Sequence, residues 1–308
     1  MKPKVAFYWC ASCGGCEEAV VDLAEKILDV VSAVDIVFWP VALDFKRADV
    51  DAMSDGAIFV TFLNGAIRSS EQEEMAHLLR RKSQLLVAFG SCSHLGGIPG
   101  LANLWTREDI FHTVYGDGAH PEGNGLPSFY DTVRTLNQVT SVDYYLPGCP
   151  PTTKLVESAL EALLGDAPPP KGAVLAPDHA LCDDCPRKDT RPPELTLDAL
   201  RRPHQVSIDE QKCLLAQGLL CLGPATRSGC EALCISGNMP CTGCFGPTSR
   251  VRDFGAKALG SVASLLAGSD AGEIARALDG IPDPAGTFYR YSLPSSLLER
   301  KRMEARHA

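Results

Sequence analysis

The chain has 308 residues, of which 45% are hydrophobic and 22% charged, so it can bury a core of ordinary size. This length predicts two domains, and this composition excludes a disordered, coiled-coil or collagen-like protein. The net charge of −9 argues against a nucleic-acid-binding surface, because phosphate binding requires a basic face. The unusual feature is the 13 cysteines, which indicate that sulfur chemistry organises the protein.

The N-terminal residues predict a cytoplasmic protein. The apolar run Val5–Trp9 is too short for the core of a signal peptide, and a twin-arginine leader is missing. No window approaches 18 uninterrupted apolar residues, so we expect no membrane span. In a reducing compartment, 13 thiols are better explained as metal ligands or redox groups than as a disulfide framework.

The first half of the chain alternates predicted strands and helices. Short apolar runs with turn residues between them predict buried strands at Lys4–Trp9, Val34–Trp39, Ala57–Phe62, Gln84–Phe89 and Val142–Leu146. Amphipathic stretches predict helices from about Glu17 to Val31, at Ser70–Arg81 and at Thr152–Leu164. This alternation predicts an α/β domain over residues 1–165, with a parallel sheet covered by helices on both faces.

The second half is organised differently. Residues 166–177 contain three consecutive prolines and predict a stiff linker to a second domain over residues 178–308. Residues 178–250 show no periodicity but hold eight cysteines, which is reasonable for a loop-rich domain if metal bonds replace the missing core. Helices are predicted beyond this segment, at Asp253–Leu266, Ala271–Leu278 and, with a polar and arginine-rich sequence, Leu297–Ala308.

Five cysteines follow predicted strands. Cys10, Cys13 and Cys16 come after the first strand, Cys92 after the fourth and Cys149 after the fifth. Ligand sites in open parallel sheets lie at the carboxyl ends of the strands, so we expect all five sulfurs to project from one edge of the sheet. Only four are needed for a four-cysteine site, and Cys10 is interpreted as the surplus one, a buried packing residue.

Two simpler interpretations of these cysteines remain open. The pair Cys13-Gly14-Gly15-Cys16, between a strand and a helix, could be a thioredoxin-like dithiol, although this leaves Cys92 and Cys149 unexplained. Zinc would also accept four thiolates, but zinc sites are usually two close cysteine pairs on knuckle turns. Ligands from three distant strand ends, set among glycine and proline, favour a bulkier inorganic core.

The second half contains eight cysteines, which is enough for two sites of four cysteines each. Without Cys10, the 13 cysteines divide into three sets of four, and four cysteines are what a cubane iron–sulfur cluster requires. Prolines follow two of these cysteines, in Cys149-Pro150 and Cys185-Pro186. The second-half cysteines are Cys182, Cys185, Cys213, Cys221, Cys230, Cys234, Cys241 and Cys244.

With these motifs, the chain resembles the small, electron-transferring subunit of [NiFe] hydrogenases, and its N-terminal half also resembles the 20 kDa iron–sulfur subunit of respiratory complex I. The stretches that carry the resemblance are Trp9–Glu17, Gly90-Ser91-Cys92, Gly96–Gly100 and Pro147–Pro151. The resemblance implies a flavodoxin-like domain that holds a proximal [4Fe–4S] cluster. Its ligands would be Cys13, Cys16, Cys92 and Cys149.

In the second half, the resemblance implies two further [4Fe–4S] clusters. Cys182-x2-Cys185-Pro186-Arg187 stands where periplasmic relatives have His-x2-Cys-Pro-Arg, so Cys182 replaces the histidine ligand of the distal cluster. Cys213 and Cys221 would complete that cluster, with a longer gap between them than in the periplasmic enzymes. Cys230, Cys241 and Cys244 match the three medial ligands, and Cys234 adds a fourth.

The all-cysteine ligation and the missing leader are similar to the cytoplasmic branch, in particular to the small subunit of methyl-viologen-reducing, F420-non-reducing hydrogenases. That resemblance implies a partner large subunit that holds the Ni–Fe centre. It also implies an electron-accepting iron–sulfur subunit, as in a heterodisulfide reductase complex. The competing interpretations are a complex I-like quinone- or ferredoxin-linked module, a free electron carrier, and a zinc-stabilised interaction protein.

Overall fold

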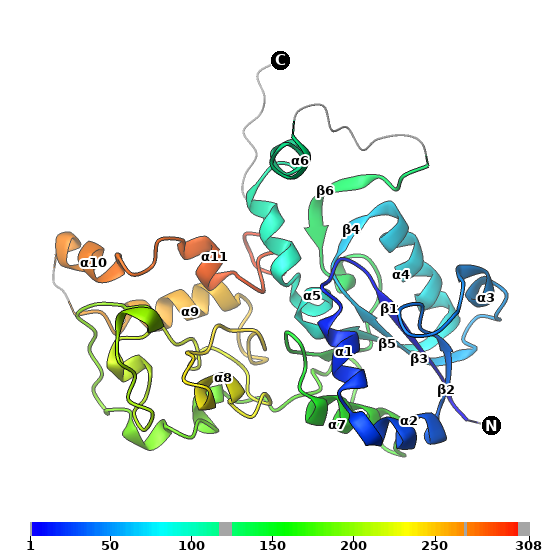
Figure 1. The fold of residues 1–308 in the computed structure, drawn as a ribbon, viewed down its shortest axis with the longest axis horizontal. Helices are drawn as coiled ribbons and strands as arrows, with labels where there is room; N and C mark the ends of the chain where they lie inside the picture. Colours follow the sequence, from blue (N-terminus) through cyan, green and yellow to red (C-terminus); the bar gives the residue numbers. More distant parts are fainter. Residues whose placement is uncertain (1, 117–124, 268–269, 301–308) are drawn as a thin grey trace. The chain divides into compact units, whose positions relative to one another are not determined.

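The computed structural model describes residues 2–116, 125–267 and 270–300. These residues form two compact units (Figure 1). The first unit contains the described residues up to Leu175 together with residues 293–300, and the second contains those of Ala176–Ser292. The change from one unit to the other falls inside the proline-rich stretch 166–177.

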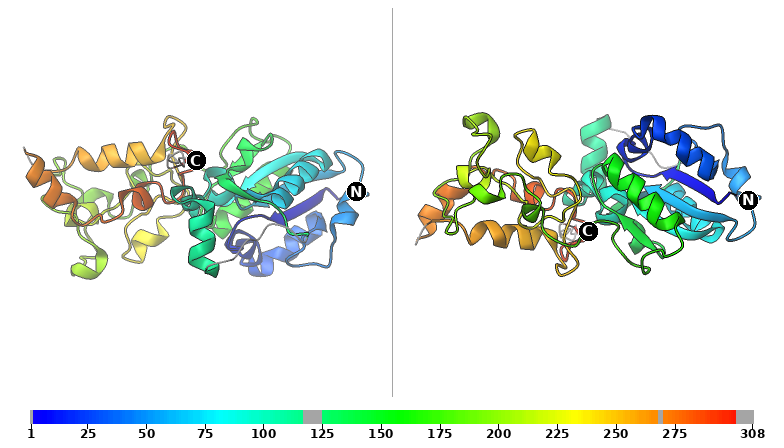
Figure 2. Two further views of the ribbon diagram at one scale, coloured as in Figure 1. Left: turned by 90° about the horizontal axis from the view of Figure 1, so that it is seen from above. Right: turned by 90° about the horizontal axis from the view of Figure 1, so that it is seen from below.

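The first unit is built on a fully parallel sheet with the strand order β2-β1-β3-β5-β7. Helices α1 and α7 contact each other on one face, and α3 and α4 contact each other on the opposite face (Figures 1 and 2). The sheet strands are β1 (Lys4–Trp9), β2 (Asp35–Phe38), β3 (Ile58–Asn64), β5 (Ser83–Phe89) and β7 (Tyr144–Leu146). The covering helices are α1 (Gly15–Val21), α3 (Arg47–Asp51), α4 (Ser70–Lys82) and α7 (Thr153–Leu164). The predicted α/β class with a flavodoxin-like sheet is therefore confirmed.

A small antiparallel ribbon of β4 (Ile67–Ser69) and β6 (Phe129–Arg134) accompanies this sheet and is not predicted from the sequence. The second unit has little regular structure. The remaining helices of the described residues are α2 (Ile27–Ala33), α5 (Gly90–Leu95), α6 (Arg107–Tyr115), α8 (Leu233–Ser236), α9 (Phe254–Ala263), α10 (Ala271–Leu278) and α11 (Pro284–Phe288). The chain also makes short 3₁₀ turns, such as Leu181–Asp183.

Two helix predictions are wrong. The single helix expected from about Glu17 to Val31 is divided, because Ala24 adopts a left-handed backbone conformation with φ 52° between α1 and α2. No residue of α2 is buried, so the apolar pattern does not correspond to one continuous buried face. The helix expected at Leu297–Ala308 is also absent where it can be tested: residues 297–300 form bends without helix, and residues 301–308 lie outside the described residues.

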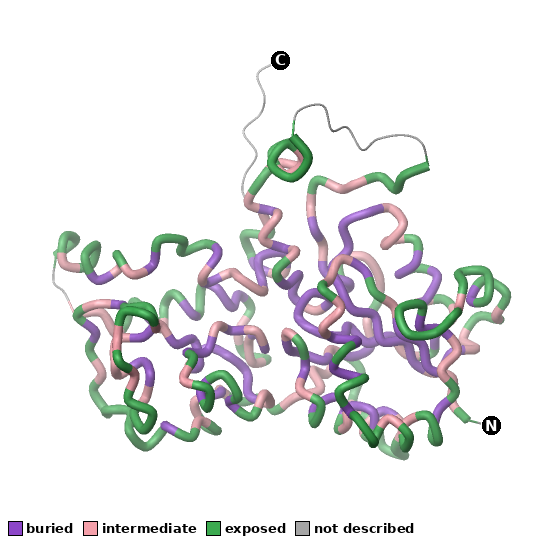
Figure 3. The backbone as a smooth tube through the Cα atoms, viewed as in Figure 1, coloured by how far each residue is buried: buried purple, intermediate pink, exposed green. Residues whose placement is uncertain are grey.

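The sheet forms a platform whose central strands consist mostly of buried residues (Figure 3). Ala6, Leu63 and Leu86 pack with residues of α4. On the other face, the rings of Phe7 and Phe62 stack with centroids 5.3 Å apart. Burial on both faces is typical of parallel sheets and explains the nearly continuous apolar runs from which the strands are predicted.

The strands of the platform end at a common level. Trp9 is paired with Asn64, Asn64 with Phe89, and Phe89 with Leu146. The loops that follow β1, β5 and β7 therefore leave from one edge of the sheet. The segment from Leu293 packs close to this edge within the same unit: Pro294 approaches Gly96 and Gly100, and its carbonyl accepts a 2.8 Å hydrogen bond from Gln138.

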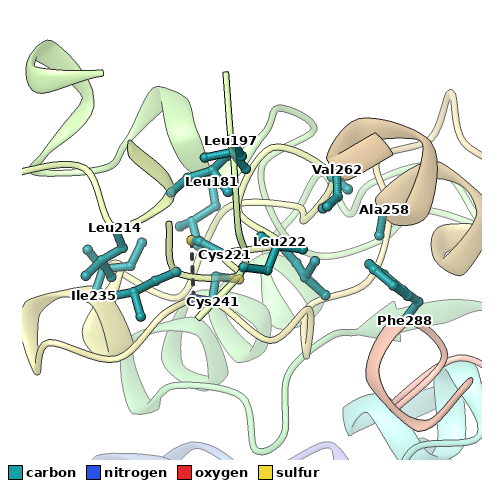
Figure 4. Close-up of a cluster of buried hydrophobic side chains, with 14 of the residues drawn as sticks. Leu181, Leu197, Leu214, Cys221, Leu222, Ile235, Cys241, Ala258, Val262 and Phe288 are labelled. Carbon is teal, nitrogen blue, oxygen red and sulfur yellow. Dashed lines mark hydrogen bonds between the residues drawn. The ribbon is translucent and has the colours of Figure 1, made fainter. Parts of the chain in front are cut away.

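The second unit is held by a leucine-rich core and by buried polar side chains. Its core includes Leu181, Leu222 and Phe288 together with two of the cysteines, Cys221 and Cys241 (Figure 4). Polar side chains replace a regular backbone ladder: the guanidinium of the buried Arg227 donates to the carbonyl oxygens of Pro177 and Pro247. Loops fixed in this way can hold side chains in place without sheet or long helix.

Candidate metal centres

Four cysteines of the first unit gather at the edge where the strands end. Cys13 and Cys16 follow β1, Cys92 lies in α5 after β5, and Cys149 follows β7. The thiol of Cys16 is close enough to those of Cys92, Cys149 and Cys13 for their charges to interact. The structure therefore brings together the four residues that the sequence assigns to the proximal site.

Two glycines leave room for the sulfurs of this set. Gly90 has φ 81°, and a Cβ atom there would lie 2.2 Å from the Sγ of Cys16. Gly97 has φ 58°, and a Cβ atom there would lie 2.4 Å from the Sγ of Cys92. Any other residue would be strained at these positions and would fill the space beside the thiols. The glycines of Gly90-Ser91-Cys92 and of Gly96-Gly97-Ile98 thus serve the cysteine site directly.

Hydrogen bonds tie the loops of the proximal site together. The N–H of Ser91 donates to the carbonyl of Gly148 at 2.7 Å, which joins the loops after β5 and β7. At the tip of β3, which carries no cysteine, the Asn64 amide donates to the buried Glu17 carboxylate at 3.0 Å. Glu17 is the neighbour of Cys16, so this contact fixes the first turn of α1 against the sheet.

Three of the four proximal thiols, those of Cys16, Cys92 and Cys149, lie where burial makes a thiolate unfavourable, whereas Cys13 is exposed. Burial raises the pKa of Cys92 to about 12, with further increases from Cys149 and Cys13, against decreases from the Ile98 N–H and the Ser12 hydroxyl. Burial likewise raises the pKa of Cys16 and Cys149. A cationic group bound here would offset this cost and stabilise the thiolates.

Cys10 lies apart from the other four. It is buried in the apolar core between the sheet and α4, near Met75 and Leu79. Burial raises its pKa, and the charges that raise it further are those of Glu71 and Glu17 rather than those of cysteines. The expectation that all five sulfurs project from the sheet edge is therefore wrong for Cys10, whereas this environment supports its interpretation as a packing residue.

In the second unit, one cavity is lined by four cysteines: Cys182, Cys185, Cys213 and Cys221. Its volume, including the open mouth, is about 330 Å³. The other lining residues are Arg191, Leu214, Leu215, Pro224 and Ile235. These four cysteines are the set assigned to the distal site, including the pair with the long gap. A thiolate-lined cavity in an apolar surround is the environment that an iron–sulfur cluster requires.

Hydrogen bonds hold the distal loops around this cavity. The N–H of Arg187 donates to the Sγ of Cys185 at 3.4 Å. The Thr190 hydroxyl donates to the carbonyl of Arg187 at 2.8 Å and accepts the N–H of Cys213 at 2.8 Å. Thr190 thus connects the Cys182–Cys185 turn to Cys213, a link across 23 residues that the spacing of the cysteines does not reveal.

At the distal site, as at the proximal one, burial and neighbouring thiols raise the pKa of a cysteine. Burial raises the pKa of Cys182 to about 12, and the neighbouring thiols of Cys221, Cys185 and Cys213 raise it further. The guanidinium of Arg191 acts in the opposite direction and favours the thiolate. Arg191 is a site residue that sequence reasoning missed; its place six residues after Cys185 gives no local signal.

The four cysteines assigned to the medial site interact as two separate pairs. Cys230 and Cys234 are separated by a sharp turn in which Glu231 and Ala232 have φ 55° and 53°, and their thiols interact electrostatically. Cys241 interacts in the same way with Cys244. Cys241 is also adjacent to the distal site, because its N–H donates to the Sγ of Cys221 at 3.4 Å (Figure 4).

Two histidines near the cysteine motifs, His179 and His94, contact an aspartate and a tyrosine. His179, three residues before Cys182, lies with its Nε2 2.8 Å from the carboxylate of Asp184. His94 packs on the ring of Tyr145, with centroids 4.6 Å apart. Among the described residues, no group of three or more His, Cys, Asp or Glu side chains is arranged to hold a single metal ion.

Known proteins match both halves of the chain. The family model "NADH ubiquinone oxidoreductase, 20 Kd subunit" matches residues 13–163. The iron–sulfur subunit of the F420-non-reducing hydrogenase of Archaeoglobus profundus is 36% identical over 98% of this chain and 99% of its own length. A subunit of the F420-non-reducing hydrogenase of Methanothermobacter thermautotrophicus is 36% identical over 97% of both chains. The chain belongs to this family of F420-non-reducing hydrogenase iron–sulfur subunits.

A solved structure supports the fold of this hydrogenase iron–sulfur subunit. A chain of the [NiFeSe]-hydrogenase of Dm. baculatum has a TM-score of 0.56 and 19% sequence identity, and the match covers 80% of this chain and 95% of that one. This likeness shows a common fold. Membership of the family makes the chain a subunit of a hydrogenase, and thus an oxidoreductase subunit with a role in electron transfer. In the part of the chain that the structure describes, no helix is both long and apolar enough to span a bilayer.

Proposed function

We propose that this chain is an electron relay with three [4Fe–4S] clusters in a cytoplasmic hydrogenase complex. Hydrogen is split at a Ni–Fe centre on a partner large subunit. Electrons then pass one at a time through a proximal, a medial and a distal cluster to an electron-accepting iron–sulfur subunit of the heterodisulfide reductase kind. The chain itself supplies the thiolates, the burial and the N–H donors that hold the clusters and set their potentials.

The cavity lined by Cys182, Cys185, Cys213 and Cys221 carries this proposal. These residues span 40 positions of the sequence and belong to a unit with little regular secondary structure, yet their side chains line a common space. One of these thiols is buried and three are half-buried, and a bound cubane cluster would explain why four cysteines line one small cavity. A free electron carrier with a single cluster would not need this second site.

The medial cysteines lie next to the distal ones in the same unit, through the contact between Cys241 and Cys221. The segment Asp209–Lys212 leads into Cys213 and is exposed, so an acceptor subunit can approach the distal site there. Electron transfer from the medial to the distal site would therefore end near a surface that a partner can reach.

A complex I-like module is the second candidate, favoured by the match of residues 13–163 to the 20 kDa subunit family. That match includes the four proximal cysteines and ends before the second unit. The eight cysteines beyond it, and the match of nearly the whole chain to iron–sulfur subunits of F420-non-reducing hydrogenases, favour the hydrogenase assignment.

The division of labour between the two subunits gives a direct test. We expect hydrogen to bleach the visible iron–sulfur absorption of this chain only in complex with the large subunit, because the chain alone has no centre that splits hydrogen. Dithionite should reduce the clusters of the isolated chain, and this control shows that they are competent. Bleaching of the isolated chain by hydrogen would contradict the proposal, as would a complex in which hydrogen reduces none of its clusters.

A further inference from the structure

Arg187 is a buried cation between the two cysteine sites of the second unit. Only 5% of its surface is exposed. It lies two residues after Cys185, and its backbone N–H donates to the Sγ of that cysteine at 3.4 Å. Its side chain reaches the other site: Nη2 donates to the carbonyl of Ile235 at 2.8 Å and to the amide oxygen of Asn238.

Those two acceptors belong to the loop that carries Cys234. Ile235 follows Cys234 in α8, and its side chain lines the distal cavity. Asn238 has φ 61°, and next to it the N–H of Met239 closes the loop by donating to the carbonyl of Cys234 at 2.8 Å. The guanidinium therefore binds the medial loop from a position on the distal loop.

The charge of Arg187 is not balanced by a direct ion pair. Among the residues that the structure describes, no carboxylate lies within salt-bridge distance of its guanidinium, and its Nη1 is buried without a hydrogen-bond partner. Two acidic groups act on this region from the solvent side: the charge of Arg187 lowers the pKa of Asp209, and Glu210 accepts a 2.9 Å hydrogen bond from the Asn238 amide. Both carboxylates are on exposed residues, where water screens them.

We infer that Arg187 is a positioning residue for electron transfer: it clamps the medial loop to the distal loop, and its charge raises the reduction potentials of the medial and distal clusters. This inference rests on the proposed function. A cubane with four thiolate ligands is an anion and becomes more negative by one charge on reduction, so a nearby buried cation favours the reduced form. Arginine stays protonated in both states, so the step moves one electron and no proton.

The inference is tested by potentiometric EPR titration of the full-length chain with Arg187→Gln and Arg187→Lys. For Arg187→Gln we expect about a tenfold fall in the reduced-to-oxidised ratio of the medial and distal clusters, or about 59 mV for one electron. Arg187→Lys keeps the charge but loses the planar fork, so its potentials should stay close to those of the parent. The proximal cluster, in the other unit, is the internal reference and should not shift.

Two further variants separate charge from structure. Lys188→Gln removes an exposed charge at the next position and should leave all potentials unchanged. Asn238→Asp keeps Arg187 and places a carboxylate beside its guanidinium, which neutralises the positive charge. Aspartate, like asparagine, tolerates a positive φ, so the loop should keep its shape. We expect this variant to lower the potentials of the medial and distal clusters. It decides the question if Arg187→Gln fails to assemble.

Unchanged potentials in Arg187→Gln at full iron content would overturn the inference. So would equal shifts in the glutamine and lysine variants, because that result assigns Arg187 a structural role alone. Failure of the proposed function is distinguishable from both, since it would appear in the parent protein as an iron content too low for three clusters.

Discussion

Replacing Cys16 by alanine is expected to remove the proximal cluster and with it about four irons per chain. Cys16 is buried at the edge of the sheet, and its thiol interacts with those of Cys92, Cys149 and Cys13. Without this buried inner ligand, we expect the proximal cubane to be lost. Electron transfer from the large subunit should then stop, because the first step of the relay is missing. Iron analysis and hydrogen-dependent reduction of the complex measure both effects.

Cys10→Ala is the matched control, because Cys10 lies six residues earlier, is equally buried and carries the same thiol. It packs in the apolar core against α4, so its loss should cost about 1 kcal/mol of stability and leave the iron content at the parent level. Equal iron loss in Cys10→Ala and Cys16→Ala would show that the ligands within this triplet are wrongly assigned.

The second large effect is expected at the medial site. Cys234→Ala should convert the medial cluster from [4Fe–4S] to [3Fe–4S], because Cys230, Cys241 and Cys244 would remain as its three ligands. Cys234 is exposed on the short helix α8, so its removal leaves no cavity in the core. We expect a new EPR signal of the [3Fe–4S] type in the oxidised protein, loss of about one iron, and a raised medial potential.

The control for this variant is Ser236→Ala on the same helix, at an exposed position two residues away. It should reproduce the parent EPR spectrum. If Cys234→Ala also keeps the parent spectrum and iron content, Cys234 is a free thiol and the medial site is not a four-cysteine site. The sharp turn at Glu231 and Ala232, which brings Cys234 back towards Cys230, would then have no role in cluster binding.

The strands of the first unit could be predicted because burial on both faces leaves continuous apolar runs such as Val5–Trp9. The sequence does not predict β4, because a strand of three residues is too short to show a period, and it does not predict β6, the distant partner of β4. The break at Ala24 was hidden as well, because alanine gives no sign of a left-handed backbone. Local sequence thus predicted the platform but not the irregular features around it.

The candidate sites show the same contrast. Proximity of Cys13, Cys16, Cys92 and Cys149 follows from the rule that parallel strands end at one edge, so topology alone predicts it. The cavity of the second unit depends instead on contacts such as the one from Thr190 to Cys213, which have no sequence period. Its cysteines could be counted in advance, but only the resemblance to a known family grouped them.

If 12 of the 13 cysteines hold three four-iron clusters, the metal and sulfide content of the chain will show it. The full-length chain, purified without oxygen, should contain about 12 irons and about 12 acid-labile sulfides, with zinc absent. A stable content near four irons, or zinc in place of iron, would mean that the second unit is not a cluster domain and that this chain is not a three-cluster relay.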